Sequence, residues 1–280
     1  MRSLTREQIV RRYAEGFGCG EGVDYRSWLQ VHSFSSRGVT TRMNGRVVRR
    51  QYVFFSSLER EVFLVAQRLP GVTDIREQVP LWPLEETEAI AKSIGVKHPA
   101  FAGNPVLMTT DLVLTRSCPE GARLEAISCK PSGELGGSRV LEKLEIERRY
   151  WAERGASWAV VTERDVPRGL ATNLEWIDEH FELGTGTVTP EAVEPCIHLL
   201  REVARSSPEL ALSDMCLVAD RRIGLLPGTC LTVFRHAVAR GTWQVSLDVF
   251  IDPSKPLPKS TPGTIPAEPG PSPAVRHDRG

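Results

Sequence analysis

The chain has 280 residues, of which 41% are hydrophobic and 25% charged, so it can form ordinary cores and has room for about two domains. Its six cysteines lie far apart without a C-x-x-C pair, which argues against both a zinc site and a disulfide framework. Because no apolar run approaches the roughly 20 residues that cross a bilayer and the first residues do not resemble a secretory signal, we expect a cytoplasmic protein without membrane contact.

The formal net charge of zero hides an uneven distribution of charged residues. Residues 1–60 carry eleven Lys/Arg against five Asp/Glu, whereas residues 171–280 carry ten against fourteen. An N-terminal polar stretch with Gly38 and Gly45 is suited to a hairpin or arm that lies along the phosphates of double-stranded DNA, although a solvated loop would have the same composition. The candidate DNA-binding residues in this stretch are Arg37, Arg42, Arg46, Arg49 and Arg50.

Periodicity predicts the first elements in chain order. Apolar residues recur at helical spacing over residues 5–15 and again over 58–69, where Glu59 lies near the helix start. Residues 72–79 are expected to form a strand. Glu59 alone is weak evidence for catalysis, since a carboxylate in the first turn also interacts favourably with the helix dipole.

Two strand-like runs follow, at residues 106–114 and 123–130, and the loop between them contains Pro119 and Gly121. A hairpin would bring Asp111 of the first run beside Lys130 at the end of the second. Two carboxylates and a lysine suit Mg²⁺-assisted cleavage of a phosphodiester. The same two residues would also be explained by a simple cross-strand ion pair.

The remainder predicts a second domain and a tail. A charge-laced helix over 140–154 and a strand over 156–162 complete the first part. Three helices and a final strand then suggest a small, mainly helical, winged-helix-like domain, whose negative charge favours protein docking over DNA binding. The expected elements of this domain are helices over 190–206, 210–221 and 229–240 and a strand over 243–251. The expected domains are therefore 1–172 and 173–251, followed by a disordered Pro-rich tail over 252–280.

Several short stretches, in order along the first two thirds of the chain, resemble one known family. They are Gly16-Phe17-Gly18-Cys19-Gly20, Asp24-Tyr25, Trp28-Leu29, Ser57-Leu58-Glu59, Asp74-Ile75-Arg76-Glu77-Gln78, Ile94-Gly95-Val96-Lys97-His98-Pro99, Thr110-Asp111, Cys129-Lys130-Pro131 and Leu141 to Trp151. Together they resemble the TnsA endonucleases, which are subunits of Tn-seven-type heteromeric transposases.

The resemblance implies an α/β fold similar to type II restriction enzymes, with a mixed central sheet flanked by helices, and Mg²⁺-dependent cleavage of DNA. It implies that Glu59, Asp111 and Lys130 are catalytic, that both carboxylates hold Mg²⁺, and that Gln78 supports the site. Ser128 stands where the family often has Gln, which puts a further metal ligand in doubt, whereas the backbone carbonyl of Cys129 remains available as a ligand.

The implied function is cleavage of the 5′ strands at transposon ends during cut-and-paste transposition. The implied partners are the DDE transposase TnsB, which would cut the 3′ ends, and the AAA+ ATPase regulator TnsC, which would engage the C-terminal half. Three alternatives remain: a stand-alone restriction- or repair-type nuclease of the same fold, a catalytically idle DNA-binding adaptor, and a winged-helix regulator.

Overall fold

The computed structural model describes residues 4–30, 40–184 and 188–258. The chain separates into two units that meet between Val166 and Pro167, and each unit has its own buried apolar core. The boundary that we expected after residue 172 falls inside helix α5 (Arg168–Asp178).

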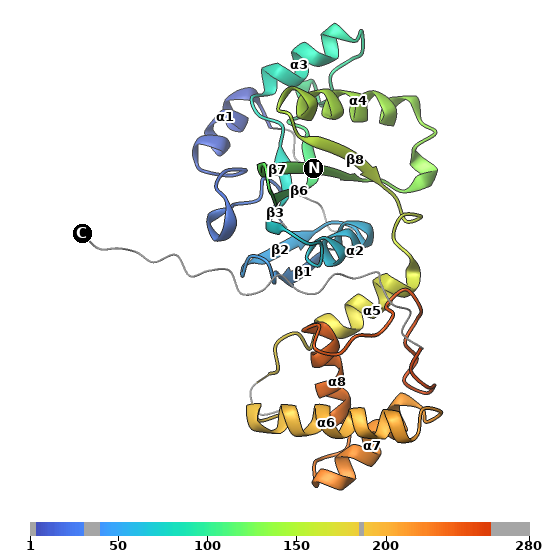
Figure 1. Cartoon of the computed structure of the whole chain (residues 1–280). Coiled ribbons are helices and arrows are strands. Elements are labelled where there is room, and N and C mark those ends of the chain that lie inside the picture. The colour runs from blue at the N-terminus through green and yellow to red at the C-terminus, as the bar shows by residue number, and fades with distance from the viewer. Residues whose placement is uncertain (1–3, 31–39, 185–187, 259–280) are drawn as a thin grey trace, which may run out of the picture. The chain divides into compact units, whose positions relative to one another are not determined.

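The N-terminal unit is built on a mixed four-stranded sheet (Figure 1). In spatial order its strands are β3 (Val72–Pro80), β6 (Thr109–Cys118), β7 (Gly121–Cys129) and β8 (Ser157–Val161). The first three strands pair antiparallel, whereas β8 pairs parallel to β7 after a crossover through helix α4 (Ser138–Glu153). The expected α/β fold with a mixed sheet flanked by helices is thus confirmed.

The expected hairpin between residues 106 and 130 is confirmed as β6–β7. Its last paired residues are Cys118 and Gly121, so Pro119 and Glu120 form the connection. Gly121 has φ +117°, which a residue with a Cβ rarely adopts, so the glycine permits this tight return. The pairing of Val113 with Ala126 places two small apolar side chains side by side on one face.

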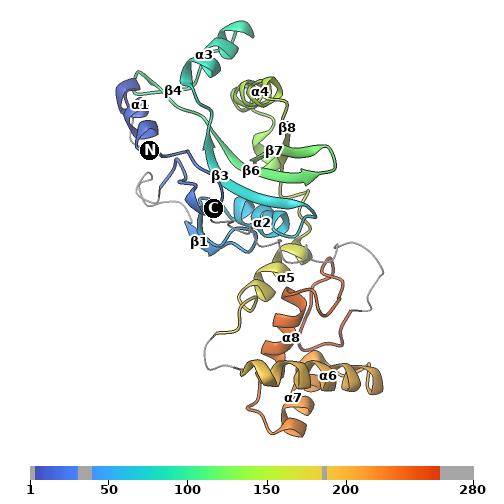
Figure 2. The ribbon, with the colours of Figure 1, turned by 60° about the vertical axis from the view of Figure 1, so that its left-hand side comes forward.

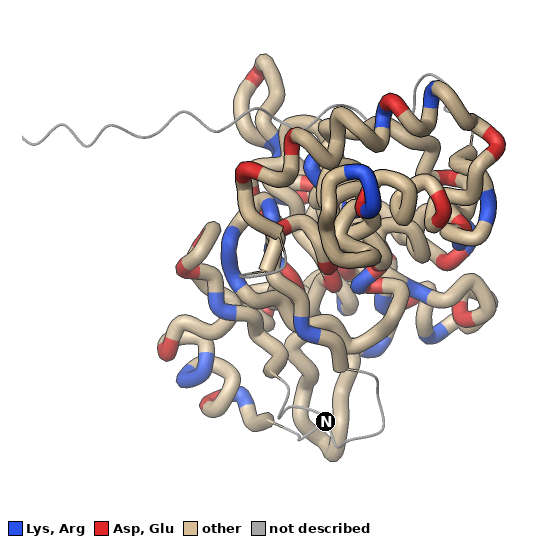
Figure 3. The backbone as a smooth tube through the Cα atoms, turned by 90° about the horizontal axis from the view of Figure 1, so that it is seen from below, with Lys and Arg blue, Asp and Glu red and all other residues tan. Residues whose placement is uncertain are grey.

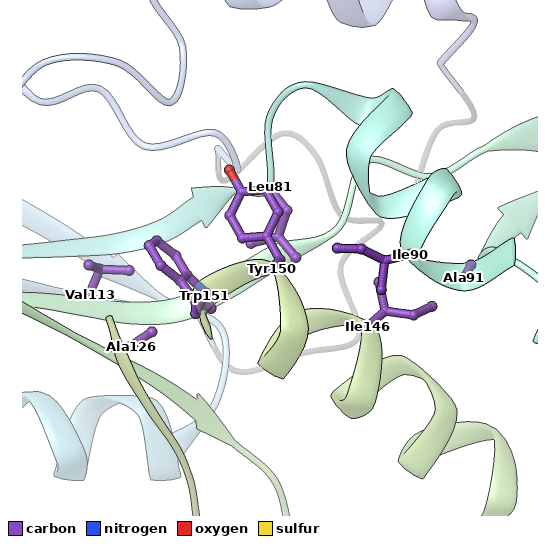
Figure 4. Packing of buried hydrophobic residues seen from close by; sticks show 8 residues of the cluster. All are labelled: Leu81, Ile90, Ala91, Val113, Ala126, Ile146, Tyr150 and Trp151. Carbon is purple, nitrogen blue, oxygen red and sulfur yellow. The ribbon is translucent and has the colours of Figure 1, made fainter. Parts of the chain in front are cut away.

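Helices cover both faces of this sheet, with α3 (Leu84–Ser93) and α4 on one side and α2 (Ser57–Ala66) on the other (Figures 1 and 2). Helix α3 was not predicted from the sequence. The apolar stripe of α4 packs against both α3 and the sheet, so α4 is fixed by burial (Figure 4). The buried residues of this cluster are Leu81, Ile90, Ala91, Val113, Ala126, Ile146, Tyr150 and Trp151.

The opposite face carries the expected hairpin of the arginine-rich stretch, which consists of β1 (Thr41–Asn44) and β2 (Gln51–Phe54). Phe63 of α2 lies 4.5 Å from the ring centre of Tyr52 and 4.7 Å from that of Phe54. These three aromatic rings hold α2 and the hairpin together.

The N-terminal helix α1 (Arg6–Ala14) begins with a capping box, in which the Thr5 hydroxyl accepts from the Gln8 backbone and the Gln8 side chain accepts from the Thr5 backbone. Its Ile9 packs in a second buried cluster with Trp28 and Leu107. The small elements of this unit are η1 (Gly22–Asp24), β4 (Ala100–Phe101), β5 (Asn104–Pro105) and η3 (Ser132–Glu134).

The described part of the C-terminal unit is helical, and α8 supplies more of its buried apolar residues than any other helix. Its helices are α5, α6 (Pro190–Ser206), α7 (Leu212–Ile223) and α8 (Thr229–Ala239). The Asp220 carboxylate of α7 accepts from the backbone N–H groups of Gly228 (2.7 Å) and Cys230 (2.8 Å), and so caps the start of α8. The three helices expected after residue 190 are confirmed, whereas α5 was not predicted. No helix within the described ranges is both long and apolar enough to cross a bilayer.

The strand expected over residues 243–251 is wrong, because this segment has no strand partner and its backbone groups are satisfied by one side chain. Asn173 of α5 donates to the carbonyls of Leu247 (2.7 Å) and Val249 (2.8 Å) and accepts from the Ile251 N–H (2.9 Å). The described C-terminal residues therefore contain no wing.

The first residues of the expected tail are held against the start of α7. The backbone N–H of Ser213 donates to the carbonyl of Pro253 at 2.8 Å, and the backbone N–H of Leu212 donates to the carbonyl of Lys255 at 2.9 Å. The rest of the Pro-rich tail, residues 259–280, lies outside the described residues.

Candidate active site

Glu59 is fixed at the first turn of α2 by its immediate neighbours. Its carboxylate accepts from the Ser56 hydroxyl at 2.9 Å and from the Phe55 backbone N–H at 3.0 Å, while its own N–H donates to the Ser56 oxygen. Burial and the nearby negative charge of Asp111 raise the pKa of Glu59 above its ordinary value. The side chain therefore belongs to the helix cap and also shares an electrostatic environment with Asp111.

Asp111 and Lys130 form the ion pair that the hairpin predicted. The Lys130 ammonium lies 2.9 Å from Asp111 Oδ2 and 2.9 Å from the carbonyl oxygen of Cys129, so it joins these two oxygens. The same Asp111 oxygen accepts from the Cys129 backbone N–H at 2.8 Å. Burial lowers the pKa of Lys130, but the charge of Asp111 and the hydrogen bond to it outweigh burial, so the pKa is raised and the ammonium is favoured.

Lys130 follows directly after the end of β7, where its backbone N–H donates to Val161 of β8 at 3.0 Å. Strand β8, the parallel neighbour of β7, therefore fixes the backbone of Lys130. The lysine side chain reaches Asp111 on β6, the antiparallel neighbour of β7. This combination requires both the β6–β7 hairpin and the crossover to β8.

Gln78 connects the two carboxylate-bearing elements. Its Nε2 donates to Glu59 Oε2 at 3.1 Å, and its Oε1 accepts from the Thr109 hydroxyl at 3.2 Å. The residue is buried and has φ +51°, a left-handed conformation that costs a residue with a Cβ on the order of 1–3 kcal/mol. The strained backbone at Gln78 in β3 directs its side-chain amide toward Glu59.

Ser128 contacts a buried carboxylate that the sequence analysis did not single out as a site residue. Its hydroxyl donates to Glu147 Oε1 of α4 at 2.5 Å, and the Thr110 hydroxyl donates to the same oxygen at 2.6 Å. Trp151 Nε1 donates to the Thr110 oxygen at 2.7 Å and extends the network. Ser128 and Thr110, which precede Cys129 and Asp111, are thus held by Glu147.

Burial, followed by the charge of Asp111, raises the pKa of Glu147 to about 7. A signal for this residue was present in the sequence, because Glu147 lies three residues after Leu144 and four before Trp151, on the apolar stripe of the helix. A carboxylate on the buried face of a helix needs specific partners.

Comparisons with known proteins show which family the chain is similar to. A family model described as "TnsA-like endonuclease N terminal" matches residues 69–163, and one described as "TnsA endonuclease C terminal" matches residues 165–247. The "Transposon Tn7 transposition protein TnsA" of Escherichia coli is 34% identical over 243 residues, which cover 85% of both chains.

The chain belongs to the TnsA endonuclease family. The family implies nuclease activity and a part in DNA transposition and recombination. The N-terminal family model includes Gln78, Asp111, Lys130 and Glu147, whereas Glu59 lies before its first matched residue.

The donor atoms of this TnsA site fit a magnesium ion. Within the described ranges no three His, Cys, Asp or Glu side chains form a metal-binding group. Mg²⁺ is usually held by only one or two carboxylates, with water and substrate phosphate completing its coordination. Glu59, Asp111 and the carbonyl of Cys129 would supply such oxygen ligands. Burial, followed by the charge of Asp111, raises the pKa of Glu59, and a bound cation would stabilise this buried negative charge.

The candidate DNA-binding arginines have different environments. Arg42 on β1 and Arg49 are exposed, and the backbone N–H of half-buried Arg46 donates to Gln67 at 2.6 Å. Arg37 lies outside the described residues. Figure 3 shows Lys and Arg interspersed with Asp and Glu along the backbone, so a DNA surface must be assigned from individual side chains.

Arg50 is committed to the interior. It pairs with Glu77 at 2.5 Å, donates to the carbonyl of Ile75 at 2.9 Å, and stacks 3.6 Å from the ring centre of Tyr52. Its side chain is only 9% exposed. Arg50 therefore stabilises the fold and is not available for the expected contact with phosphate.

Proposed function

We propose that this TnsA-family chain is a Mg²⁺-dependent DNA endonuclease that cleaves the 5′ strands at transposon ends during cut-and-paste transposition. The observation that supports this most directly is the Lys130 ammonium between Asp111 Oδ2 and the Cys129 carbonyl oxygen. An ion pair that served only the fold would not require Gln78 to adopt a strained backbone in order to reach the second carboxylate.

Glu59, Asp111 and the Cys129 carbonyl would hold the Mg²⁺. The ion would stabilise negative charge on the phosphate and lower the pKa of a bound water. Gln78 would keep Glu59 oriented by its hydrogen bond at 3.1 Å.

Lys130 would act as a cation. Because the charge of Asp111 raises its pKa, the group is protonated near neutral pH and does not accept the proton of the attacking water. The ammonium would orient that water and offset the charge that develops on the phosphate. Ser128 would act indirectly, through its hydrogen bond to Glu147.

Cleavage of both strands would need partners. We assign the 3′ ends to the DDE transposase TnsB and regulation to the AAA+ ATPase TnsC, acting with this chain on double-stranded DNA in the cytoplasm. The helical C-terminal unit is our candidate for contact with the ATPase, and exposed Arg42 and Arg49 are our candidates for contact with phosphate.

A strand-specific cleavage assay on end-labelled transposon-end DNA, with and without the transposase and ATPase, tests this function. Asp111→Ala should abolish 5′-strand cleavage because it removes an ion ligand and the partner of Lys130. The control is Glu120→Gln, at the exposed turn of the same hairpin.

Activity of Asp111→Ala within about tenfold of the parent chain, which corresponds to ~1.4 kcal/mol in the barrier, would exclude the assigned role. Robust cleavage without any partner would instead support a stand-alone nuclease. Normal transposition by Asp111→Ala would support the idle adaptor.

A further inference from the structure

The backbone of β3 departs from regular strand geometry at Gln78, opposite Asp111 of β6. The register of β3 with β6 is continuous on both sides of this position but leaves out the pair of Gln78 with Asp111. Gln78 has φ +51° instead of the ~−140° of an antiparallel strand, so the peptide group between Glu77 and Gln78 is rotated from its regular orientation. A contact that holds this peptide group therefore helps to set where the Gln78 amide points.

The side chain of Tyr25 makes such a contact. Its hydroxyl donates at 2.9 Å to the carbonyl oxygen of Glu77, which belongs to the rotated peptide group. Tyr25 is only 5% exposed, and burial, followed by the charge of Glu77, raises its pKa, so the hydroxyl keeps its proton and can donate. A strained backbone conformation persists only where surrounding contacts hold it. The Tyr25 hydroxyl is thus placed to hold the strained conformation of Gln78.

Arg50 fixes both members of this contact. Its guanidinium carbon lies 5.2 Å from the ring centre of Tyr25, and its Nη2 pairs with the Glu77 carboxylate at 2.5 Å. Glu77 is therefore held at its side chain by Arg50 and at its carbonyl by Tyr25. Because the side chain is anchored separately, the Tyr25 hydroxyl acts on the orientation of the carbonyl and not on the position of the whole residue.

The glycine-rich stretch before Tyr25 packs closely against β3. Gly18 has φ +78°, and a Cβ on it would lie 2.2 Å from Cγ of Pro80, so only glycine allows this approach. The backbone N–H of Gly22 donates to the Asp74 carboxylate, also on β3, at 3.2 Å. These two contacts fix the segment against β3 just before Tyr25, and so bring the hydroxyl within reach of the peptide group at Gln78.

We propose that Tyr25 is a positioning residue for strand cleavage: its hydroxyl holds the peptide group before Gln78, and the Gln78 amide in turn orients Glu59 for holding Mg²⁺. The inference rests on the proposed function only in taking Glu59 as a group that acts in cleavage. Groups that orient a metal ligand without touching the metal typically change metal affinity or activity by roughly 10–100-fold when they are removed. The buried hydroxyl of Tyr25 would act at one further step, through Gln78.

The first test is structural and needs neither metal nor DNA. Crystal structures of the full-length chain and its Tyr25→Phe variant give φ of Gln78 and the distance from Gln78 Nε2 to Glu59 Oε2. In the variant the peptide group should rotate back, so Gln78 should take a negative φ and its amide should leave hydrogen-bond distance of Glu59. The matched control is Tyr150→Phe, which loses a buried hydroxyl that donates to the carbonyl of Trp82 at 2.7 Å and should leave Gln78 at φ near +51°.

The second test asks whether Tyr25 acts through Gln78. Single-turnover cleavage of transposon-end DNA, with transposase and ATPase present, is measured for Tyr25→Phe, Gln78→Ala and the double variant. Tyr25→Phe should cleave at least about tenfold more slowly than the parent chain. The double variant should cleave no more slowly than Gln78→Ala, because the two residues act in one series of contacts. Tyr150→Phe should cleave at the rate of the parent chain.

A Tyr25→Phe structure in which Gln78 keeps φ near +51° and its contact with Glu59 would overturn the proposal. Losses of cleavage that multiply in the double variant, or an equal loss in Tyr150→Phe, would also overturn it, because Tyr25 would then serve the fold alone. Thermal unfolding shows that each variant is folded. If the parent chain does not cleave DNA, the proposed function fails, while the crystal structures still decide whether Tyr25 positions Gln78.

Discussion

The Lys130 ammonium lies 2.9 Å from both Asp111 Oδ2 and the Cys129 carbonyl oxygen, so one charged nitrogen connects the end of β7 with the start of β6. Two acceptors on a single nitrogen constrain the position of the charge more tightly than a simple ion pair does. The position of that charge, and not only its sign, therefore matters for the chemistry that we propose.

Lys130→Ala should abolish strand cleavage because it removes this charge. Lys130→Arg should restore little activity, since a planar guanidinium cannot place one nitrogen against the same two oxygens with the same geometry. Single-turnover cleavage of transposon-end DNA with all partners present checks both variants, with Lys143→Ala on the exposed face of α4 as the control. Full activity of Lys130→Arg would mean that the site needs only a nearby positive charge.

Gln78 offers a way to separate strain from function. Gln78→Ala and Gln78→Gly both lose the hydrogen bond to Glu59, so both should lose cleavage activity to a similar extent. Only glycine accepts φ +51° without strain, so the glycine variant should be more stable than the alanine variant by about 1 kcal/mol. Urea unfolding and cleavage rates test this pair, and equal stability of the two variants would contradict the inferred strain.

Glu147 should make stability depend on pH. Its pKa is about 7 in the folded chain and near 4.5 when unfolded, so the folded state binds the additional proton and stability falls as pH rises between these values. This one group should lower the free energy of unfolding by roughly 3 kcal/mol at most. Glu147→Gln cannot ionise but can still accept from Ser128 and Thr110, so it should lose this part of the pH dependence.

Urea unfolding at pH 5 and pH 8 without divalent metal measures the difference between Glu147→Gln and the parent chain. Glu153→Gln, at an exposed position of the same helix, is the control. If the variant and the parent chain show the same change between the two pH values, Glu147 does not titrate as its burial implies.

Substitution of Arg50 should affect the stability of the chain, whereas substitution of Arg42 should affect DNA binding. Arg50→Gln leaves the Glu77 carboxylate buried without its partner, so it should destabilise the chain by roughly 3–5 kcal/mol. Arg42→Gln removes an exposed charge, so it should leave stability unchanged and lower the salt slope of DNA binding by about 1. If Arg50→Gln is instead stable and lowers the salt slope of DNA binding, Arg50 contacts DNA and does not stabilise the fold.

The sequence by itself determined the features that depend on neighbouring residues. Apolar periodicity predicted α1, α2, α4, α6, α7 and α8, because a helix buries one face of its own turns. The turn at Pro119 and Gly121 predicted the hairpin and with it the meeting of Asp111 and Lys130. The family resemblance then drew attention to Gln78 and Glu59, whose contact no spacing rule implies.

Only the tertiary structure decided where the remaining polar groups find their partners. Arg50 and Glu77, Ser128 and Glu147, and Asn173 and the backbone of residues 247–251 are each separated by many positions in the chain. A buried polar group must be satisfied by whatever the fold brings near it, and local sequence patterns do not encode that partner. For this reason arginines that look alike in the sequence have different roles, and a strand-like segment is held by an asparagine instead of a sheet.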